Sequence, residues 1–333
     1  MRNKKIIMGT AFILLAGCMF LQGCGGNEKG KKDYTPYFSD NPSSSQLNLE
    51  YTYVEIGEYP QTRIKNQELT EEIIQGEYNT QGIGTVAEQK IYRMEYGDTT
   101  EYYRMEPIRW RIMECNEETV MLWSDCIIDA KAYDDFNLES GGTLSWSDSE
   151  LRAWLNEEFY EQAFSEEEKN SIVAYEYENY DSNYYGVYGV DAEKKKEESF
   201  IDTTTDFVSL LDYYTMYVLQ VDCPYKINGT DPIQINPDGS LLFGCKNTDY
   251  AWTRFKQGLR EDSRYYDRVV QGYWSRTPIK GTDYCVIVDK LGPDYSCNEE
   301  SKMNQNQSVQ GVRPVIVVKR DNLEKYIVEN NEE

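Results

Sequence analysis

Short apolar and β-branched runs, separated by polar turns, dominate the chain from residue 51 onward. Arg109 to Met113 and Thr119 to Trp123 enclose the polar turn Asn116-Glu117-Glu118, and this order predicts a β-hairpin. Tyr284 to Val288 and Val312 to Val318 are continuous apolar runs, which is typical of central strands. The pattern therefore predicts a domain with a large share of β-sheet.

Helical spacing of apolar residues occurs in fewer places. Ser147-Asp148-Ser149 is a helix cap, and the apolar residues that follow it at helical spacing are Leu151, Trp154, Leu155 and Phe159. Ser165 and Glu168 have the spacing of a capping box before a second helix, and Ser209 to Leu219 is a third candidate. Because strands and helices do not alternate regularly, we expect an α+β fold rather than a doubly wound sheet.

The first two dozen residues have the order of a bacterial export signal. Three cations precede an apolar stretch from Ile6 to Leu15, and two cysteines then follow small residues in the manner of a lipobox. Cleavage before Cys24 removes the whole apolar run with the signal and leaves a polar N-terminus on the mature protein. Cys18 is the alternative site of lipid attachment. The chosen cysteine would carry a diacylglycerol, with palmitate or another acyl chain on its amino group where the organism adds one. We expect residues 1–23 to be removed.

The rest of the chain divides by composition. Residues 24–50 are polar and carry prolines, serines and mixed charges, so we expect a flexible tether. Residues 51–320 suit a single domain, and residues 321–333 a charged C-terminal tail. The expected location is the outer face of the bacterial cytoplasmic membrane, where the lipid is the anchor.

Charge and composition narrow the function classes. The formal net charge of −24 becomes −27 when the three cations of the export signal are removed. Such an acidic surface repels phosphate backbones, so we expect no nucleic-acid partner. The chain contains no histidine, which excludes Ser-His-Asp and Cys-His triads as well as histidine-ligated zinc. We therefore expect no catalytic residues, no cofactor and no metal.

Six cysteines follow the lipobox, at positions 115, 126, 223, 245, 285 and 297. None forms a C-x-x-C pair, which excludes a zinc ribbon and a thioredoxin-like motif. Outside the cell, disulfides between Cys223 and Cys245 or between Cys285 and Cys297 would close short loops. Buried free thiols are an equal alternative.

Two sets of acidic residues do not have the spacing of a known catalytic or calcium site. Glu157 and Glu158 are neighbours on a helix, so their carboxyls point about a quarter turn or more apart. The two working carboxyls of a glycosidase face one bond and lie about 5 to 10 Å from each other. Asp231, Asn236 and Asp238 miss the spacing of a calcium loop, and a turn between two short strands explains them.

Six motifs occur in order along the domain: GEYPQ at 57–61, EPIRWR at 106–111, LRAWLNEEFY at 151–160, TDYA at 248–251, WSRTP at 274–278 and GVRP at 311–314. The series resembles a large family of domains of unknown function found in lipoproteins and secreted proteins of Gram-positive bacteria. That family is similar to the sulfatase-modifying-factor branch of the C-type lectin-like fold, which implies a compact α+β domain whose long loops form a binding surface. The chain lacks the paired active cysteines of that branch and the Glu-Pro-Asn or Gln-Pro-Asp of sugar-binding lectins, so the resemblance implies neither formylglycine chemistry nor calcium-bridged sugar binding.

The large side chains of the motifs have a structural explanation. Trp110 and Trp154 lie on amphipathic elements, and we expect them in the core. Arg276 and Arg313 lie within two residues of a proline or tryptophan, where a planar guanidinium stacks and binds carbonyls. We therefore expect structural roles for all four.

A tyrosine-rich segment is the main candidate for ligand contact. Tyr184, Tyr185 and Tyr188 are interleaved with small polar residues, a composition typical of recognition loops, and an inserted, solvated loop explains it equally well. Trp274 is a fourth candidate contact. We expect a noncatalytic binding or interaction domain for an extracellular glycan or protein. The alternatives are an extracellular enzyme that uses carboxylates or a thiol on polysaccharide, and a structural component of the envelope.

Overall fold

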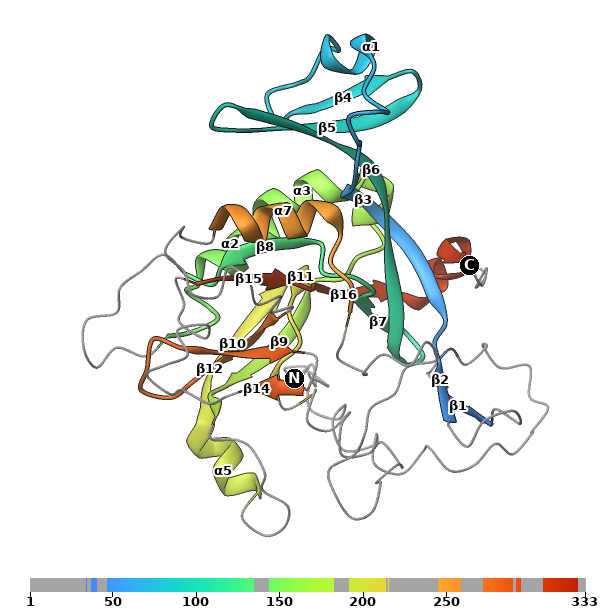
Figure 1. Ribbon diagram of the computed structural model, residues 1–333. Coiled ribbons are helices and arrows are strands. Elements are labelled where there is room, and N and C mark those ends of the chain that lie inside the picture. The colour runs from blue at the N-terminus through green and yellow to red at the C-terminus, as the bar shows by residue number, and fades with distance from the viewer. Residues whose placement is uncertain are drawn as a thin grey trace, which may run out of the picture.

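The computed structural model describes residues 34, 37–40, 47–134, 144–182, 192–213, 215, 245–258, 272–289, 292–294 and 308–328. It is a mixed α+β structure in which most of the regular elements are strands and the helices are few and short. Two sheets form the body, and an arm projects from the larger one (Figure 1).

The larger sheet has eight strands, and its central path runs β11-β16-β7-β6-β3-β17, with β5 paired to β6 and β4 paired to β5. All of its pairings are antiparallel. The strands are β3 (Tyr53–Arg63), β4 (Ile83–Val86), β5 (Gln89–Tyr96), β6 (Thr99–Cys115), β7 (Thr119–Ser124), β11 (Val208–Ser209), β16 (Val315–Lys319) and β17 (Ile327–Val328).

The smaller sheet has five strands in the order β14-β13-β12-β15-β8, and only the β12–β15 pair is parallel. Two further antiparallel pairs are β9 with β10 and β1 with β2. These strands are β8 (Asp129–Ala132), β12 (Tyr273–Pro278), β13 (Cys285–Asp289), β14 (Gly292–Asp294), β15 (Val309–Val312), β9 (Tyr175–Tyr180), β10 (Phe200–Asp206), β1 (Tyr37–Asp40) and β2 (Leu47–Glu50).

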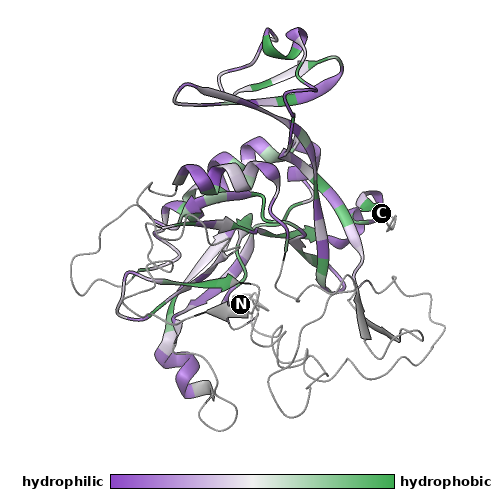
Figure 2. Cartoon of the chain, in the orientation of Figure 1, coloured by the Kyte–Doolittle hydropathy of each residue, from purple (hydrophilic) through white to green (hydrophobic). Residues whose placement is uncertain are grey.

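One continuous helical segment and a second helix lie beneath the arm (Figure 1). The segment consists of α2 (Glu150–Trp154), a π-helical turn η1 (Leu155–Phe159) and α3 (Tyr160–Ala163), and the second helix is α7 (Asp249–Gly258). The other helices of the described residues are α1 (Glu71–Ile74), α4 (Glu166–Lys169), α5 (Ala192–Ser199) and the 3₁₀ turns η4 (Arg320–Asn322) and η5 (Glu324–Tyr326). Figure 2 shows hydrophilic residues along α5 and on α7, and hydrophobic residues along the central strands.

The arm consists of residues 64–104, which carry α1, β4, β5 and the first part of β6. A small apolar cluster of its own, formed by Ile64, Val86, Ile91 and Tyr102, holds it together. Because β6 continues without a break from the arm into the larger sheet, the arm is attached through a paired strand.

The main core joins residues from almost the whole described chain. Trp110 of β6, Phe159 of η1 and Ile316 of β16 are all fully buried in it. Gly57 of the GEYPQ motif has φ +77°, and a Cβ there would come within 2.7 Å of the Phe164 ring, so glycine suits both its backbone and its packing. The early motifs thus belong to the same core as the late ones.

Several sequence predictions are confirmed. The hairpin around Asn116 is formed by β6 and β7. Ser149 caps α2, and Ser165 and Glu168 form the predicted capping box at α4. The apolar run at 284–288 forms β13.

Other predictions differ from the structure. The run from Val312 to Val318 forms two strands, because Arg313 and Pro314 interrupt it between β15 and β16. The helix predicted from Ser209 is wrong at its start, since Val208 and Ser209 pair with β16. Helix α7 lay outside the predicted helices.

The ends of the domain also extend further than the composition indicates. Strands β1 and β2 pair within the segment 24–50 expected to be a tether. Past residue 320, Leu323 is fully buried and β17 pairs with β3, so the folded domain continues to Val328 rather than ending in a charged tail at 321.

Candidate functional site

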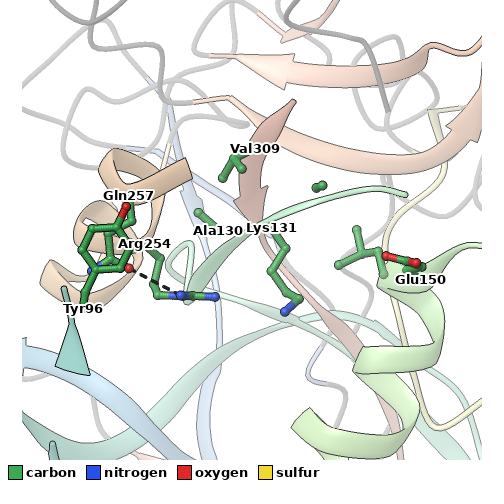
Figure 3. Close-up of a pocket in the computed structure, with 9 residues that line it drawn as sticks. Tyr96, Ala130, Lys131, Glu150, Arg254, Gln257 and Val309 are labelled. Carbon is green, nitrogen blue, oxygen red and sulfur yellow. Dashed lines mark hydrogen bonds between the residues drawn. The ribbon is translucent and has the colours of Figure 1, made fainter. Parts of the chain in front are cut away.

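A hollow of about 380 Å³ lies where the arm meets the body, and we call it the arm pocket. Its walls come from β8, the start of α2, α7, the first residue of β15 and the last residue of β5. Its polar lining residues are Tyr96, Lys131, Glu150, Arg254 and Gln257. In Figure 3, Tyr96, Gln257 and Arg254 lie on one side and Glu150 on the other, with Lys131 between them. This volume is within the range of small-ligand sites.

A buried carboxylate holds the arginine of the arm pocket. Asp129 is 2 % exposed, and its two oxygens accept hydrogen bonds from the Tyr59 hydroxyl and the Ala130 backbone N–H, both at 2.7 Å. The Nε of Arg254 lies 3.4 Å from the same carboxylate, and its Nη1 donates to Gln257 Oε1 at 3.4 Å. Burial alone would lower the pKa of Arg254, but the Asp129 carboxylate outweighs that effect and the net pKa is raised, so this guanidinium is a permanent cation.

A cluster of tyrosine rings supports this arrangement from behind. Tyr250 of α7 makes edge contacts with Tyr59, Tyr92 and Tyr103, with ring centroids 5.2 to 5.7 Å apart. Burial and the Asp129 carboxylate raise the pKa of Tyr59 well above its usual value, so its hydroxyl stays a donor. Because Tyr92 belongs to the arm and Tyr59 to the body, the cluster fixes the arm against α7.

Lys131 supplies the second cation. It lies on β8, opposite Gln310 of β15, and its side chain is half-buried. Its Nζ lies 4.6 Å from the centre of the Trp154 ring, which is half-buried on α2. No carboxylate of the described residues lies within 4 Å of this ammonium group. The tryptophan therefore positions the charge without neutralising it.

Tyr96 provides the aromatic surface of the arm pocket. It is the last residue of β5 and pairs with Thr99 across the tip of the arm hairpin. Its side chain is 56 % exposed, which is unusual for so large a ring. A ring held at this position offers a flat face to a ligand that enters between the arm and the helices.

A second, acidic hollow of about 660 Å³ lies further along the same helices. Gln81 and Tyr92 line it from the arm, and Glu157, Glu158 and Glu161 are among the residues that line it from η1 and α3. Within the described residues, no group of three or more acidic or cysteine side chains is placed to hold a metal ion. The acidic hollow is thus a negatively charged neighbour of the arm pocket.

The predicted contact residues lie apart from the arm pocket or outside the described residues. Trp274 is 1 % exposed, and its indole N–H donates to the Lys131 carbonyl at 2.9 Å, so its ring packs in the core behind the pocket. Tyr184, Tyr185 and Tyr188 lie outside the described residues, as do Cys18 and Cys24. The start of the tyrosine-rich segment forms β9, and Tyr177 and Tyr180 within it are buried rather than presented on a loop.

The tryptophans and arginines expected to be structural occupy distinct environments. Trp110 is fully buried, and its indole N–H donates to the Ile56 carbonyl at 2.8 Å. Trp154 is half-buried beneath Lys131. Arg276 of β12 donates to Asn179 Oδ1 of β9 at 3.1 Å and to the Leu210 carbonyl at 3.0 Å. It also lies 3.2 Å from the Asp212 carboxylate, so it joins β12, β9 and the segment at 210–212.

Arg313 of the GVRP motif is the most enclosed of the cationic side chains in the described core, at 1 % exposed. Its guanidinium carbon lies 3.4 Å from the centre of the Trp123 ring. Its Nε donates to the Ser124 carbonyl at 2.8 Å and its Nη1 to the Tyr273 hydroxyl at 3.2 Å. This arginine connects β7, β12 and the turn between β15 and β16.

Among the described residues, Cys126, Cys245 and Cys285 are free thiols. Cys223 and Cys297, the other members of the two predicted disulfides, lie outside the described residues. Burial raises the pKa of Cys126 to about 11 and that of Cys285 well above its usual value. Neither thiol therefore has the lowered pKa of a catalytic nucleophile.

The residues that line the arm pocket were not among the sequence candidates. Lys131 stands between Ala130 and Ala132, which leave room around it, but a lysine between alanines is too common to indicate a site. Arg254 follows the TDYA motif by three residues, and Tyr96 precedes a Gly-Asp turn. Their convergence depends on the arm folding over α7, which no local pattern indicates.

The comparisons with known proteins give one match. The family described as a domain of unknown function, DUF6273, matches residues 117–320, more than half of the chain. The match includes every polar residue of the arm pocket except Tyr96. No curated protein and no solved structure matches the chain. Among the described residues, no helix is long and apolar enough to cross a membrane.

Proposed function

The chain belongs to the DUF6273 family, and on that premise we propose that it is a surface lipoprotein whose domain binds an extracellular glycan in the arm pocket, without catalysis. The observation that carries this proposal is the convergence of Tyr96, Lys131, Arg254, Gln257 and Glu150 on one hollow. An apolar pocket with a few convergent polar groups is the usual form of a small-ligand site.

A glycan suits the chemistry of these groups. The exposed ring of Tyr96 offers a flat face for the apolar side of a pyranose. Lys131 and Arg254 supply donors, and the side-chain oxygens of Glu150 and Gln257 supply acceptors, so sugar hydroxyls find both partners in one place. The tyrosine cluster fixes the walls, which reduces the entropy lost when a ligand binds.

The arrangement of carboxylates favours binding over hydrolysis. Glu157, Glu158 and Glu161 line the acidic hollow from one helical segment, and its lining from the arm consists of Gln81 and Tyr92. A glycosidase needs carboxyls on both sides of the scissile bond. Nor do the buried thiols favour a cysteine enzyme, since burial raises their pKa values.

Anchoring through Cys24, or through Cys18, would place the arm pocket outside the cell, where glycans are found. We expect a clickable fatty acid to label the protein in cells, and Cys24→Ala to abolish the label. Loss of the label only in Cys18→Ala would assign the lipid to Cys18. An unlabelled protein recovered with cytosolic proteins would contradict the surface location.

Kinship with the sulfatase-modifying-factor branch of the C-type lectin-like fold is part of the same proposal. The mixed α+β body supports it, as does the GVRP motif, which ends β15 and leads into the buried strand β16. An experimental structure of the protein would test it by superposition on members of that branch. A different strand order in the core would contradict it.

The direct test of glycan binding uses residues 25–333 on a glycan array. We expect Tyr96→Ala to remove most of the binding, because the stacking face is lost. Phe200→Ala is the matched control, since Phe200 is a comparably exposed ring on β10 that lines neither hollow. A third variant, Tyr184→Ala with Tyr185→Ala, tests the tyrosine-rich segment. Loss of binding in that variant alone would place the ligand there, and no binding in the parent protein would contradict the proposal.

A further inference from the structure

Two cations face one small hollow in a protein whose formal net charge is −24. Many lysines and arginines of the described residues lie within 4 Å of a carboxylate, as Lys169 does with Glu161 and Glu166. Lys131 differs, because its contact is the Trp154 ring rather than an acidic group. A positive charge held in this way is available to a ligand.

Arg254 keeps part of its guanidinium for the arm pocket. Its Nε faces Asp129 at 3.4 Å and its Nη1 faces Gln257, whereas its Nη2 donates to no residue that the structure describes. The Asp129 carboxylate also accepts two shorter hydrogen bonds, from Tyr59 and from the Ala130 backbone. Its charge is therefore shared among three donors, and Arg254 retains positive potential toward the hollow.

The remaining lining groups limit what kind of anion fits. Glu150 is a carboxylate at the opposite side of the arm pocket, so a multiply charged group such as a phosphate monoester would meet repulsion there. A single carboxylate placed near Lys131 and Arg254 leaves Glu150 free to accept from hydroxyls. Tyr96 offers its ring to the body of the sugar.

From these contacts we propose that the arm pocket selects sugars that carry a free carboxylate, as uronic and sialic acids do. The inference rests on the proposed glycan-binding function and names the class of sugar. The overall negative charge of the protein does not prevent it, because charges more than about 8 Å apart are largely screened at physiological salt. The two cations of the arm pocket act within that distance.

The test compares each acidic sugar with its own uncharged form. Trisaccharides ending in glucuronate, galacturonate or N-acetylneuraminate, and the methyl ester of each, are titrated calorimetrically into residues 25–333. At least one free acid is expected to bind about tenfold more tightly than its ester, since a charge-assisted hydrogen bond is stronger than a neutral one.

Variants of Lys131 then locate the preference. Lys131→Met keeps the length of the side chain over Trp154 but removes the charge, so the ratio of acid affinity to ester affinity should fall to near one. Lys131→Arg keeps the charge and should keep this ratio. Lys256→Met is the matched control, because Lys256 lies over the Trp252 ring at 4.9 Å on α7 but does not line the arm pocket. It should keep the full ratio.

The outcomes separate this inference from the function on which it rests. Equal binding of acids and esters overturns the carboxylate preference while glycan binding stands. An acid preference that survives Lys131→Met also overturns it, because the charge that selects the acid then lies elsewhere. If neither acids, esters nor neutral glycans bind, both the inference and the proposed function fail.

Discussion

Arg313 and Arg254 show how differently two regions of this protein use the same side chain. Arg313 is enclosed by Trp123, Tyr273 and a backbone carbonyl, and it connects strands of both sheets. Arg254 is half-buried at the edge of a hollow, where a carboxylate holds it from behind. We call Arg313 and the residues that enclose it, Trp123, Ser124 and Tyr273, the motif core. In the motif core the cation stabilises the fold, whereas in the arm pocket the cations face solvent.

The difference has a consequence for mutation. Substitutions in the motif core should lower the free energy of unfolding. They should reduce ligand binding only when the protein no longer folds. Substitutions in the arm pocket should change binding while leaving stability nearly intact. Variants in each region test this division.

Arg313→Ala should give the largest loss of stability. It removes the stack on Trp123, leaves the Ser124 carbonyl without its donor and opens a cavity. We expect the free energy of unfolding to fall by about 3 to 5 kcal/mol, measured by urea denaturation. Arg254→Ala, the same change at the half-exposed arginine, should cost about 1 to 2 kcal/mol. Equal losses for the two variants would contradict the division between core and pocket.

Alkaline pH should destabilise the core next most strongly. Burial raises the pKa values of Tyr59, Tyr133, Tyr177, Tyr250 and Tyr273 above 10.0. Above pH 10 the unfolded chain loses these protons while the folded chain keeps them, so stability is complete below pH 10 and falls as pH rises. Each such group contributes about 1.4 kcal/mol per pH unit.

The variant Tyr177→Phe checks this assignment, since it keeps the ring beneath Arg276 but removes the ionisable hydroxyl. Its unfolding free energy should match the parent protein at pH 7 and decline less steeply between pH 10 and 11.5, as followed by circular dichroism in urea. An identical decline in the two proteins would show that Tyr177 is not among the responsible groups.

Trp274→Phe probes the boundary between the two regions. Its ring stays in the core, but the hydrogen bond from the indole to the Lys131 carbonyl is lost. We expect a loss of about 1 kcal/mol in stability, because one buried acceptor is left unpaired. Binding should weaken only slightly. A large loss of binding with no loss of stability would mean that Trp274 contacts the ligand, as its place among the sequence candidates suggests.

Lys131→Met should have the smallest effect on stability. Its charge lies over a half-buried ring, and such contacts contribute about 0.5 to 1 kcal/mol at partly exposed sites. The same variant should lose most of its preference for acidic sugars. A large drop in the unfolding midpoint would contradict a binding role and assign Lys131 to the fold.

The sequence predicts the local elements of this protein well where side chains act on near neighbours. The turn at Asn116, the cap at Ser149 and the capping box at Ser165 depend on residues within a few positions of one another. The α+β class follows from the irregular order of such elements. Helix α7 was missed because its apolar stripe is short and its tyrosine packs with rings from distant strands.

The arm pocket could not be predicted in the same way. Tyr96, Lys131 and Arg254 are separated by 35 to 158 positions, and none of them carries a local signature. They meet because β6 carries the arm over α7 and because Tyr250 joins Tyr59 to Tyr92. The six sequence motifs identify core residues, because bulky buried side chains form the clearest sequence patterns. The residues that face the ligand lie between these motifs.

Hydrogen–deuterium exchange in the presence of a bound acidic trisaccharide tests the central claim most directly. We predict slower exchange at residues 129–132, 150–151 and 254–257 and at the tip of the arm near Tyr96, with no change in the buried strands around Arg313. Protection confined to segments that do not line the arm pocket would contradict it.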